Sequence, residues 1–107
     1  MSEVSDVQKP IIDRLKEAGC IVLRLNSGGR VGRVQLLPKG TPDLLALVPG
    51  GLALWIEVKT EDGELSDKQR EFHSELRRYG QIVEVVRSVS EAMEALNRAL
   101  SLTKQCS

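Results

Sequence analysis

The stretch KGTPDLLALVPGGLALWIEVKT, residues 39–60, decides the fold of this chain. It holds two apolar runs separated by Pro-Gly-Gly at positions 49–51, and these residue types are typical of a tight turn. The pattern predicts a β-hairpin of two mostly buried strands. Asp43, Glu57 and Lys59 interrupt the apolar pattern, and a buried strand does not carry charge without a specific role. The three charged residues therefore mark a candidate site.

The spacing of these charges predicts that they meet at one end of the hairpin. Side chains alternate along a strand, so Glu57 and Lys59 project from the same face. Asp43 opens the first strand, and antiparallel pairing can bring it level with Glu57 at the far end of the second. Two adjacent carboxylates repel each other unless a cation lies between them, and oxygen ligands suit Mg²⁺ or Mn²⁺. The alternative is an ordinary salt bridge between Lys59 and Glu57 on an exposed sheet face.

The order of the motifs resembles that of a known nuclease family. Pro42-Asp43, a hairpin turn and then Glu57-Val58-Lys59 resemble the PD-(D/E)xK nuclease motif. The flanking segments narrow the resemblance to the virus-type replication–repair nuclease (VRR-NUC) domain; they are Arg24-Leu25-Asn26-Ser27-Gly28, Lys39-Gly40-Thr41-Pro42-Asp43, Ile56-Glu57-Val58-Lys59 and Leu65-Ser66 with Gln69. The resemblance extends from about Val4 to Leu96, and the chain looks like a stand-alone member of the sort found in phages and bacteria.

The resemblance implies a metal-dependent nuclease. The carboxylates of Asp43 and Glu57, with the backbone carbonyl of Val58, would hold one or two Mg²⁺ or Mn²⁺ ions. Such an ion binds a scissile phosphate oxygen and lowers the pKa of a bound water. Lys59 would orient or activate that water, or neutralise charge that grows on the phosphate.

Further site residues are expected on two helices. In the resembled family the first helix carries an acidic metal ligand, for which Glu3 and Asp6 are the candidates here and Glu17 is a weaker third. The alternative is that Glu3 and Asp6 only favour a helix N-terminus. A glutamine beside the family's active site corresponds to Gln69, which also has the spacing from Ser66 of a capping box. These two interpretations of Gln69 are not exclusive. His73, the single histidine, is interpreted as solvated or packed rather than catalytic.

The net charge of zero hides an uneven distribution. No acidic residue lies between Glu17 and Asp43, and a basic loop beside an acidic metal site suits a phosphate backbone. Basic and polar residues of this segment are expected to contact DNA phosphates, which position a protein without reading sequence; they are Arg24, Asn26, Ser27, Arg30, Arg33 and Lys39. The alternative is a solvated loop. No G-x-x-x-x-G-K-[ST] pattern is present, so no nucleotide cofactor is expected.

The fold expected for residues 1–107 is a single α/β domain, with a core over about 4–100 and a frayed tail at 103–107. The elements follow the order α-β-β-β-α-β-α, and a mixed sheet is flanked by helices, as in restriction-endonuclease-like PD-(D/E)xK cores. The strand at 82–86 follows a helix and is expected to run parallel to the Glu57 strand. No apolar run approaches the ~20 residues of a membrane span. Two distant cysteines favour a reducing cytosol, which is that of the bacterial host if a phage encodes the chain.

The expected activity is structure-selective hydrolysis of phosphodiester bonds by an endonuclease, in branched DNA such as four-way (Holliday) junctions. Cutting two arms needs two sites, and a symmetric homodimer supplies them most simply. The resemblance to stand-alone members points the same way. The alternatives are a non-catalytic DNA-binding module of the same fold and a less selective nuclease that needs a partner. A structural or interaction protein in which Lys59 pairs with Glu57, and a sequence-specific restriction-type enzyme, are further alternatives.

Overall fold

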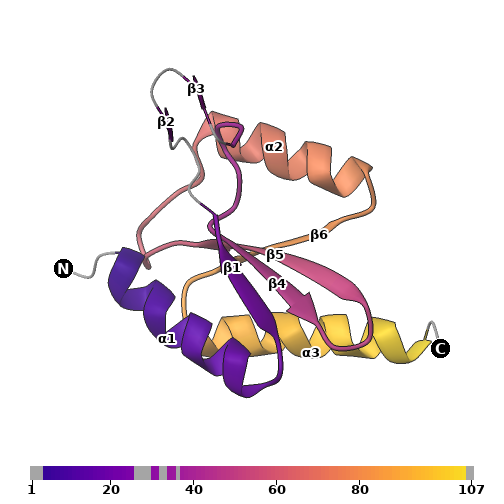
Figure 1. Cartoon of the computed structure of the whole chain (residues 1–107). Helices are drawn as coiled ribbons and strands as arrows, with labels where there is room; N and C mark the ends of the chain where they lie inside the picture. The colour runs from indigo at the N-terminus through magenta and orange to yellow at the C-terminus, as the bar shows by residue number, and fades with distance from the viewer. Residues whose placement is uncertain (1–3, 26–29, 32–33, 36, 106–107) are drawn as a thin grey trace.

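The computed structural model describes residues 4–25, 30–31, 34–35 and 37–105. A four-stranded mixed sheet lies between helices on its two faces (Figure 1). The elements in chain order are α1 (Val4–Glu17), β1 (Ile21–Arg24), β2 (Arg30–Val31), β3 (Val34–Gln35), β4 (Leu44–Val48), β5 (Leu52–Val58), α2 (Asp67–Arg78), β6 (Ile82–Val86) and α3 (Val89–Gln105).

The sheet has the strand order β1-β4-β5-β6. The expected hairpin is present: β4 and β5 are antiparallel, and Leu44 lies opposite Ile56. Gly50 and Gly51 make the turn with φ of 102° and 101°, a region that favours glycine. The strand β6 runs parallel to β5, as expected. Apart from a two-stranded ribbon of β2 and β3, the element order is the predicted α-β-β-β-α-β-α.

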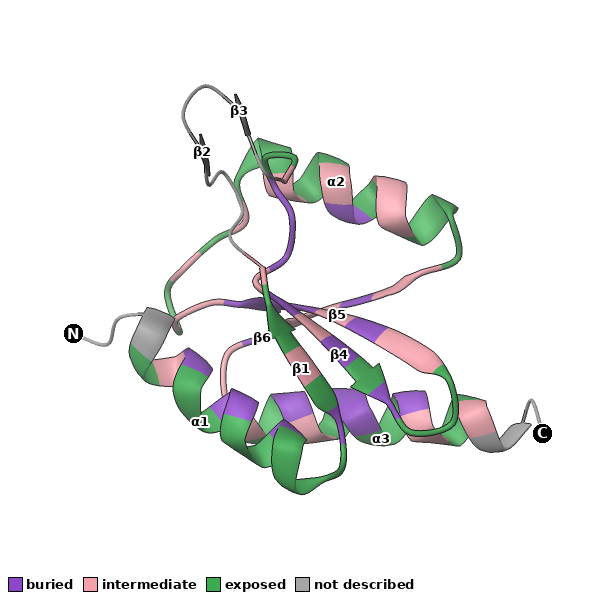
Figure 2. Ribbon diagram, in the orientation of Figure 1, coloured by how far each residue is buried: buried purple, intermediate pink, exposed green. Residues whose placement is uncertain are grey.

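The main core lies between the sheet and the helices α1 and α3 (Figure 2). Alternation along β5 directs its even-numbered apolar residues into this core, where Leu54 and Ile56 are fully buried. The helix α3 contributes the small residues Ala92, Ala95 and Ala99, which let its backbone approach the sheet closely. This helix extends to Gln105, past the position where a tail was expected to begin.

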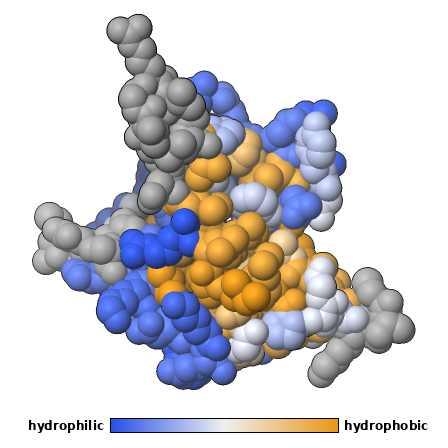
Figure 3. Space-filling view, viewed as in Figure 1, coloured by the Kyte–Doolittle hydropathy of each residue, from blue (hydrophilic) through white to orange (hydrophobic). Residues whose placement is uncertain are grey.

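The opposite face of the sheet carries α2, which packs mainly against β6. Over β1 and β4 this face stays open, and large apolar side chains are exposed there: Ile21 by 62%, Leu23 by 44% and Leu47 by 40% (Figure 3). Trp55 on β5 is partly covered, and its Nε1–H donates to Oε1 of Gln81 at 2.9 Å. Within the described ranges, no helix is long and apolar enough to cross a membrane.

The start of α2 is fixed by side-chain capping. Ser66 accepts from the backbone N–H of Gln69 at 3.2 Å, and the Oε1 of Gln69 accepts from the backbone N–H of Ser66 at 2.9 Å. The predicted capping box is therefore confirmed. Gly40, with φ of 89°, packs its backbone against the first turn of this helix. The capped helix and the loop before Asp43 thus lie in direct contact.

Candidate active site

The three charged residues of the hairpin lie at one end of the sheet. Asp43 immediately precedes β4, Glu57 is near the end of β5, and the pairing of Leu44 with Ile56 sets the two carboxylates side by side. Oδ2 of Asp43 accepts the backbone N–H of Val58 at 2.8 Å. The carbonyl of Asp43 accepts the N–H of Leu25 at 2.8 Å, which ties the end of β1 to the same point. The strand ends therefore fix the position of Asp43.

Glu57 is a buried carboxyl group, with 1% of its surface exposed. Burial raises its pKa to about 9, and a hydrogen bond with Asp43 and the negative charge of Asp43 add to the rise, whereas Lys59 opposes it. Glu57 therefore keeps a proton at neutral pH in the metal-free chain. The alternative of a surface salt bridge does not hold, because Glu57 is buried and the described residues include no ion pair between it and Lys59.

Lys59 completes the set on the same face of β5. Its backbone N–H donates to the carbonyl of Val86 at 3.0 Å, which continues the pairing of β5 with β6. Its positive charge lowers the pKa of Glu57 and also that of His73, so the ammonium group lies close to both. The side chain is half-buried. A cation is thus positioned beside the two carboxyl groups.

The structure adds His73 of α2 to this cluster. Its ring is 1% exposed, and Nε2 lies 3.1 Å from Oε1 of Glu57. Burial lowers its pKa, and the charges of Arg77 and Lys59 lower it further against the opposing charge of Asp43, which favours the neutral ring. The expectation of a packed histidine is confirmed, but its contact with Glu57 was missed. One feature of the sequence could have predicted that His73 lies near the site. His73 is four residues after Gln69, and this spacing places both residues on one side of the helix.

The donor set fits a hard divalent ion. The carboxyl groups of Asp43 and Glu57 lie next to each other, and the hydrogen bond with Asp43 and its negative charge add to the rise that burial causes in the pKa of Glu57. Oxygen donors of this kind suit Mg²⁺ or Mn²⁺, which keep several waters in their shell. Among the described residues, no group of three His, Cys, Asp or Glu side chains is placed to hold an ion. Glu3 lies outside the described residues, and Asp6 is exposed in the first turn of α1.

The residues expected to hold DNA are described only in part. Asn26, Ser27 and Arg33 lie outside the described residues, and Arg30 belongs to β2 without a described side chain. Arg24 is exposed on β1. It lines a hollow of about 350 Å³ whose other residues belong to α1: Gln8, Lys9, Ile12, Asp13 and Lys16.

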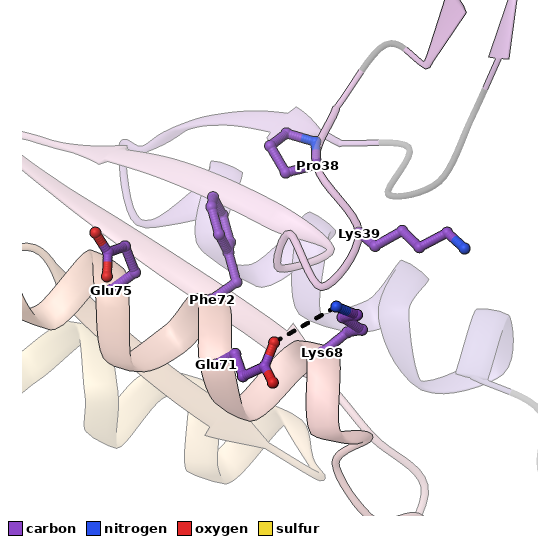
Figure 4. A pocket seen from close by; sticks show the side chains of 6 residues that line it. All are labelled: Pro38, Lys39, Lys68, Glu71, Phe72 and Glu75. Carbon is purple, nitrogen blue, oxygen red and sulfur yellow. Dashed lines mark ion pairs between the residues drawn. The ribbon is translucent and has the colours of Figure 1, made fainter. Parts of the chain in front are cut away.

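Lys39 is also exposed, in the loop before β4. Together with Pro38 it faces α2 across a hollow of about 470 Å³, whose helix side carries Lys68, Glu71, Phe72 and Glu75 (Figure 4). Lys68 pairs with Glu71 at 3.7 Å. The side chain of Lys39 extends away from the side chains of α2 in Figure 4.

Because the pKa of Glu57 is raised in the folded protein, we expect the metal-free protein to lose stability as the pH rises. Its folded-state pKa is above the usual value of 4.5, so the folded protein holds a proton that the unfolded chain releases. The contribution of Glu57 to the free energy of unfolding is complete below pH 4.5 and is lost as the pH approaches about 9. Between these values the free energy of unfolding falls by on the order of 1 kcal/mol per pH unit. Thermal melts in EDTA should therefore show a melting temperature that falls across this window.

Glu57→Gln provides the matched comparison, because glutamine is nearly isosteric and does not titrate. Its melting temperature should vary less with pH than that of the wild type over the same window. Equal slopes for the two proteins would show that Glu57 titrates normally in the folded state.

Comparisons with known proteins agree with this geometry. The family model described as the VRR-NUC domain matches residues 31–90. A solved structure titled "VRR_NUC domain" superposes with a TM-score of 0.72 and 28% sequence identity, over 91% of this chain and 97% of that chain. A search of curated proteins found no match. The match covers the loop before β4, the hairpin with its charged end, α2 and β6. The chain therefore belongs to the VRR-NUC family and is a nuclease-type domain.

Proposed function

We propose that this protein is a metal-dependent endonuclease that cuts branched DNA such as four-way junctions. The observation that carries the proposal is the buried carboxyl group of Glu57 against the half-buried Asp43 and beside Lys59, at one sheet end of a nuclease-type domain. Holding a buried carboxyl group next to a second one costs stability, and a binding site for a divalent cation is a functional reason to retain them.

The two carboxyl groups and the lysine have distinct tasks. Asp43 and Glu57, with the carbonyl of Val58, would hold the ion. When bound, Mg²⁺ or Mn²⁺ polarises the scissile phosphate and supplies a water of lowered pKa. Lys59 orients that water and neutralises charge that develops on the phosphate. Hydrolysis leaves a 5′-phosphate and a 3′-hydroxyl.

Surrounding residues position the DNA. Arg24 and Lys39 are exposed cations on either side of the segment 26–36 and would contact backbone phosphates. Gln69 uses its Oε1 in the helix cap, so its amide NH₂ group is the part that would assist at the site. Asp6, in the first turn of α1, is the described candidate for the additional acidic ligand.

A homodimer would supply the two sites that a junction needs. The part of the chain that the structure describes holds one such cluster, and symmetric cuts in two arms require a second copy. Mass measurement by light scattering during size-exclusion chromatography tests this part. A strictly monomeric protein at the concentration used for cleavage would contradict the two-site arrangement.

The activity is tested with labelled four-way junction, splayed-arm and linear duplex DNA, each with Mg²⁺, Mn²⁺ or EDTA. We expect the junction to be cut in either metal and all cutting to stop in EDTA. Binding of DNA without cutting in any metal would instead indicate the non-catalytic DNA-binding module. Equal cutting of all three substrates would contradict selectivity for branched DNA but not metal-dependent catalysis.

A further inference from the structure

We infer that His73 is a positioning residue that holds the Glu57 carboxylate in the orientation that binds the metal. The inference rests on the proposed function, because it assigns Glu57 as a metal ligand. Its basis is the contact of 3.1 Å between Nε2 of His73 and Oε1 of Glu57. Both side chains are nearly free of solvent contact, with exposures of 1% and 2%. Water therefore does not compete with this hydrogen bond.

The ring is held by a rigid support. His73 lies in the middle of α2, whose first turn is fixed by the capping box of Ser66 and Gln69. One turn after His73, the guanidinium of Arg77 donates from Nη2 to the carbonyl of Val83 at 3.0 Å. This bond ties the helix to β6, the neighbour of β5. A group that orients a ligand acts best from such a fixed element.

The surroundings of the ring select one tautomer. Nδ1 of His73 is buried and has no hydrogen-bond partner among the described residues. A proton on Nδ1 would leave a buried donor unpaired, whereas an unprotonated Nδ1 leaves only an unpaired lone pair. A carboxylate that binds a metal can only accept hydrogen bonds. Both conditions place the single ring proton on Nε2, where it is donated to Glu57.

The hydrogen bond decides which oxygens remain for the ion. It occupies Oε1 of Glu57 and leaves Oε2 for the metal. Asp43 is arranged in the same way. Its Oδ2 accepts a hydrogen bond from the Val58 N–H, and its Oδ1 is the oxygen that could bind the ion. Each carboxylate is thus fixed through one oxygen by a protein donor and offers the other to the ion. Partners of this kind orient ligands and tune metal affinity.

A spectroscopic test uses the fact that His73 is the chain's only histidine. Proton–nitrogen correlation spectra of ¹⁵N-labelled wild-type protein then report this ring alone. We expect a protonated Nε2 and an unprotonated Nδ1, and both signals should shift on titration with diamagnetic Mg²⁺ but not in Asp43→Asn. A ring protonated at Nδ1, or signals that stay fixed while Mg²⁺ binds, would overturn the inference.

A second test separates positioning from packing. Mn²⁺ affinity is measured by calorimetry for the wild type, His73→Leu, which removes the donor, and His73→Gln, whose amide can replace it. We expect His73→Leu to bind Mn²⁺ about 10- to 100-fold more weakly, and His73→Gln to restore most of the affinity. Melting temperatures of the metal-free variants are recorded beside the affinities.

The outcomes distinguish this inference from the proposed function. If the wild type and His73→Leu bind Mn²⁺ equally and Asp43→Asn does not bind it, the positioning role of His73 is overturned. The proposed metal site is then still supported, and His73 only packs beside it. Equal weakening by the leucine and glutamine variants would also assign the effect to packing. Absence of Mn²⁺ binding in the wild type would overturn the proposed function and this inference together. If His73→Leu does not fold, the glutamine variant and the spectra still decide the matter.

Discussion

Asp43→Asn is expected to lower the rate of DNA cleavage by at least about 10³-fold while the protein stays folded. The substitution removes one of two negative ligands but keeps an oxygen that can accept the backbone N–H of Val58. The contact between the start of β4 and the end of β5 should therefore persist. DNA binding should also persist, because the cations expected to contact phosphates are unchanged.

Lys59→Met is expected to have an effect of similar size on cleavage. The stem of Lys59 lies near Gly63 in the turn after β5, because a Cβ added to Gly63 would be 3.5 Å from Cδ of Lys59. Methionine retains this apolar stem and removes the ammonium group, so packing changes little. What is lost is the positive charge that acts on Glu57 and His73.

Single-turnover cleavage and DNA binding by fluorescence anisotropy, both in Mg²⁺, measure these effects. Asp13→Asn is the matched control, because it makes the same chemical change at an exposed residue of α1 that pairs with Lys9. It should cleave like the wild type. Cleavage by Asp43→Asn or Lys59→Met at the control's rate, in pure preparations, would remove that residue from the mechanism.

The parts of the fold that depend on local pattern could be predicted from the sequence. Alternating apolar residues and the turn at 49–51 define the hairpin, and the alternation also places Glu57 and Lys59 on one face. Asp43 meets Glu57 because a short hairpin allows little choice of register. The capping of α2 follows from the spacing of Ser66 and Gln69 alone.

The rest depends on how elements pack, which no local pattern specifies. The helical period shows that His73 lies beside the apolar stripe of α2, but the rotation of this helix against the sheet decides whether the ring meets Glu57. The guanidinium of Arg87 similarly donates to the carbonyls of Thr60 at 2.7 Å and Gly63 at 2.6 Å, and so holds the turn after Lys59. An arginine at a strand end has no sequence signal for such a role.

Gly40 shows how packing outside the charged cluster sets the site, and Gly40→Ala is expected to destabilise the fold strongly. A Cβ on Gly40 would clash with the carbonyl oxygen of Lys68 and would lie 2.6 Å from its carbonyl carbon. Both atoms belong to the backbone of the first turn of α2, so no side-chain rotation can relieve the clash. The φ of 89° adds a further cost for any residue with a side chain.

Gly80→Ala separates these two causes. Gly80 follows α2 with a similar φ of 83°, but no atom of the described residues beyond its chain neighbours lies within 4 Å of an added Cβ. Its replacement should cost only the backbone strain, about 1–2 kcal/mol, whereas Gly40→Ala should cost about 3 kcal/mol or more. In a domain of this size each kcal/mol corresponds to a fall of about 4–8 °C in melting temperature.

The two glycine variants also test whether the loop and α2 must touch for the site to form. Gly40 is three residues before Asp43, so a loop displaced from the helix moves this carboxylate away from Glu57. We expect Gly40→Ala to lose Mn²⁺ affinity at temperatures where it is still folded, and Gly80→Ala to retain it. Equal melting temperatures and equal Mn²⁺ affinities for the two variants would contradict this close contact. A loss confined to Gly40→Ala would show that a glycine without any functional group sets the geometry of the carboxylate pair.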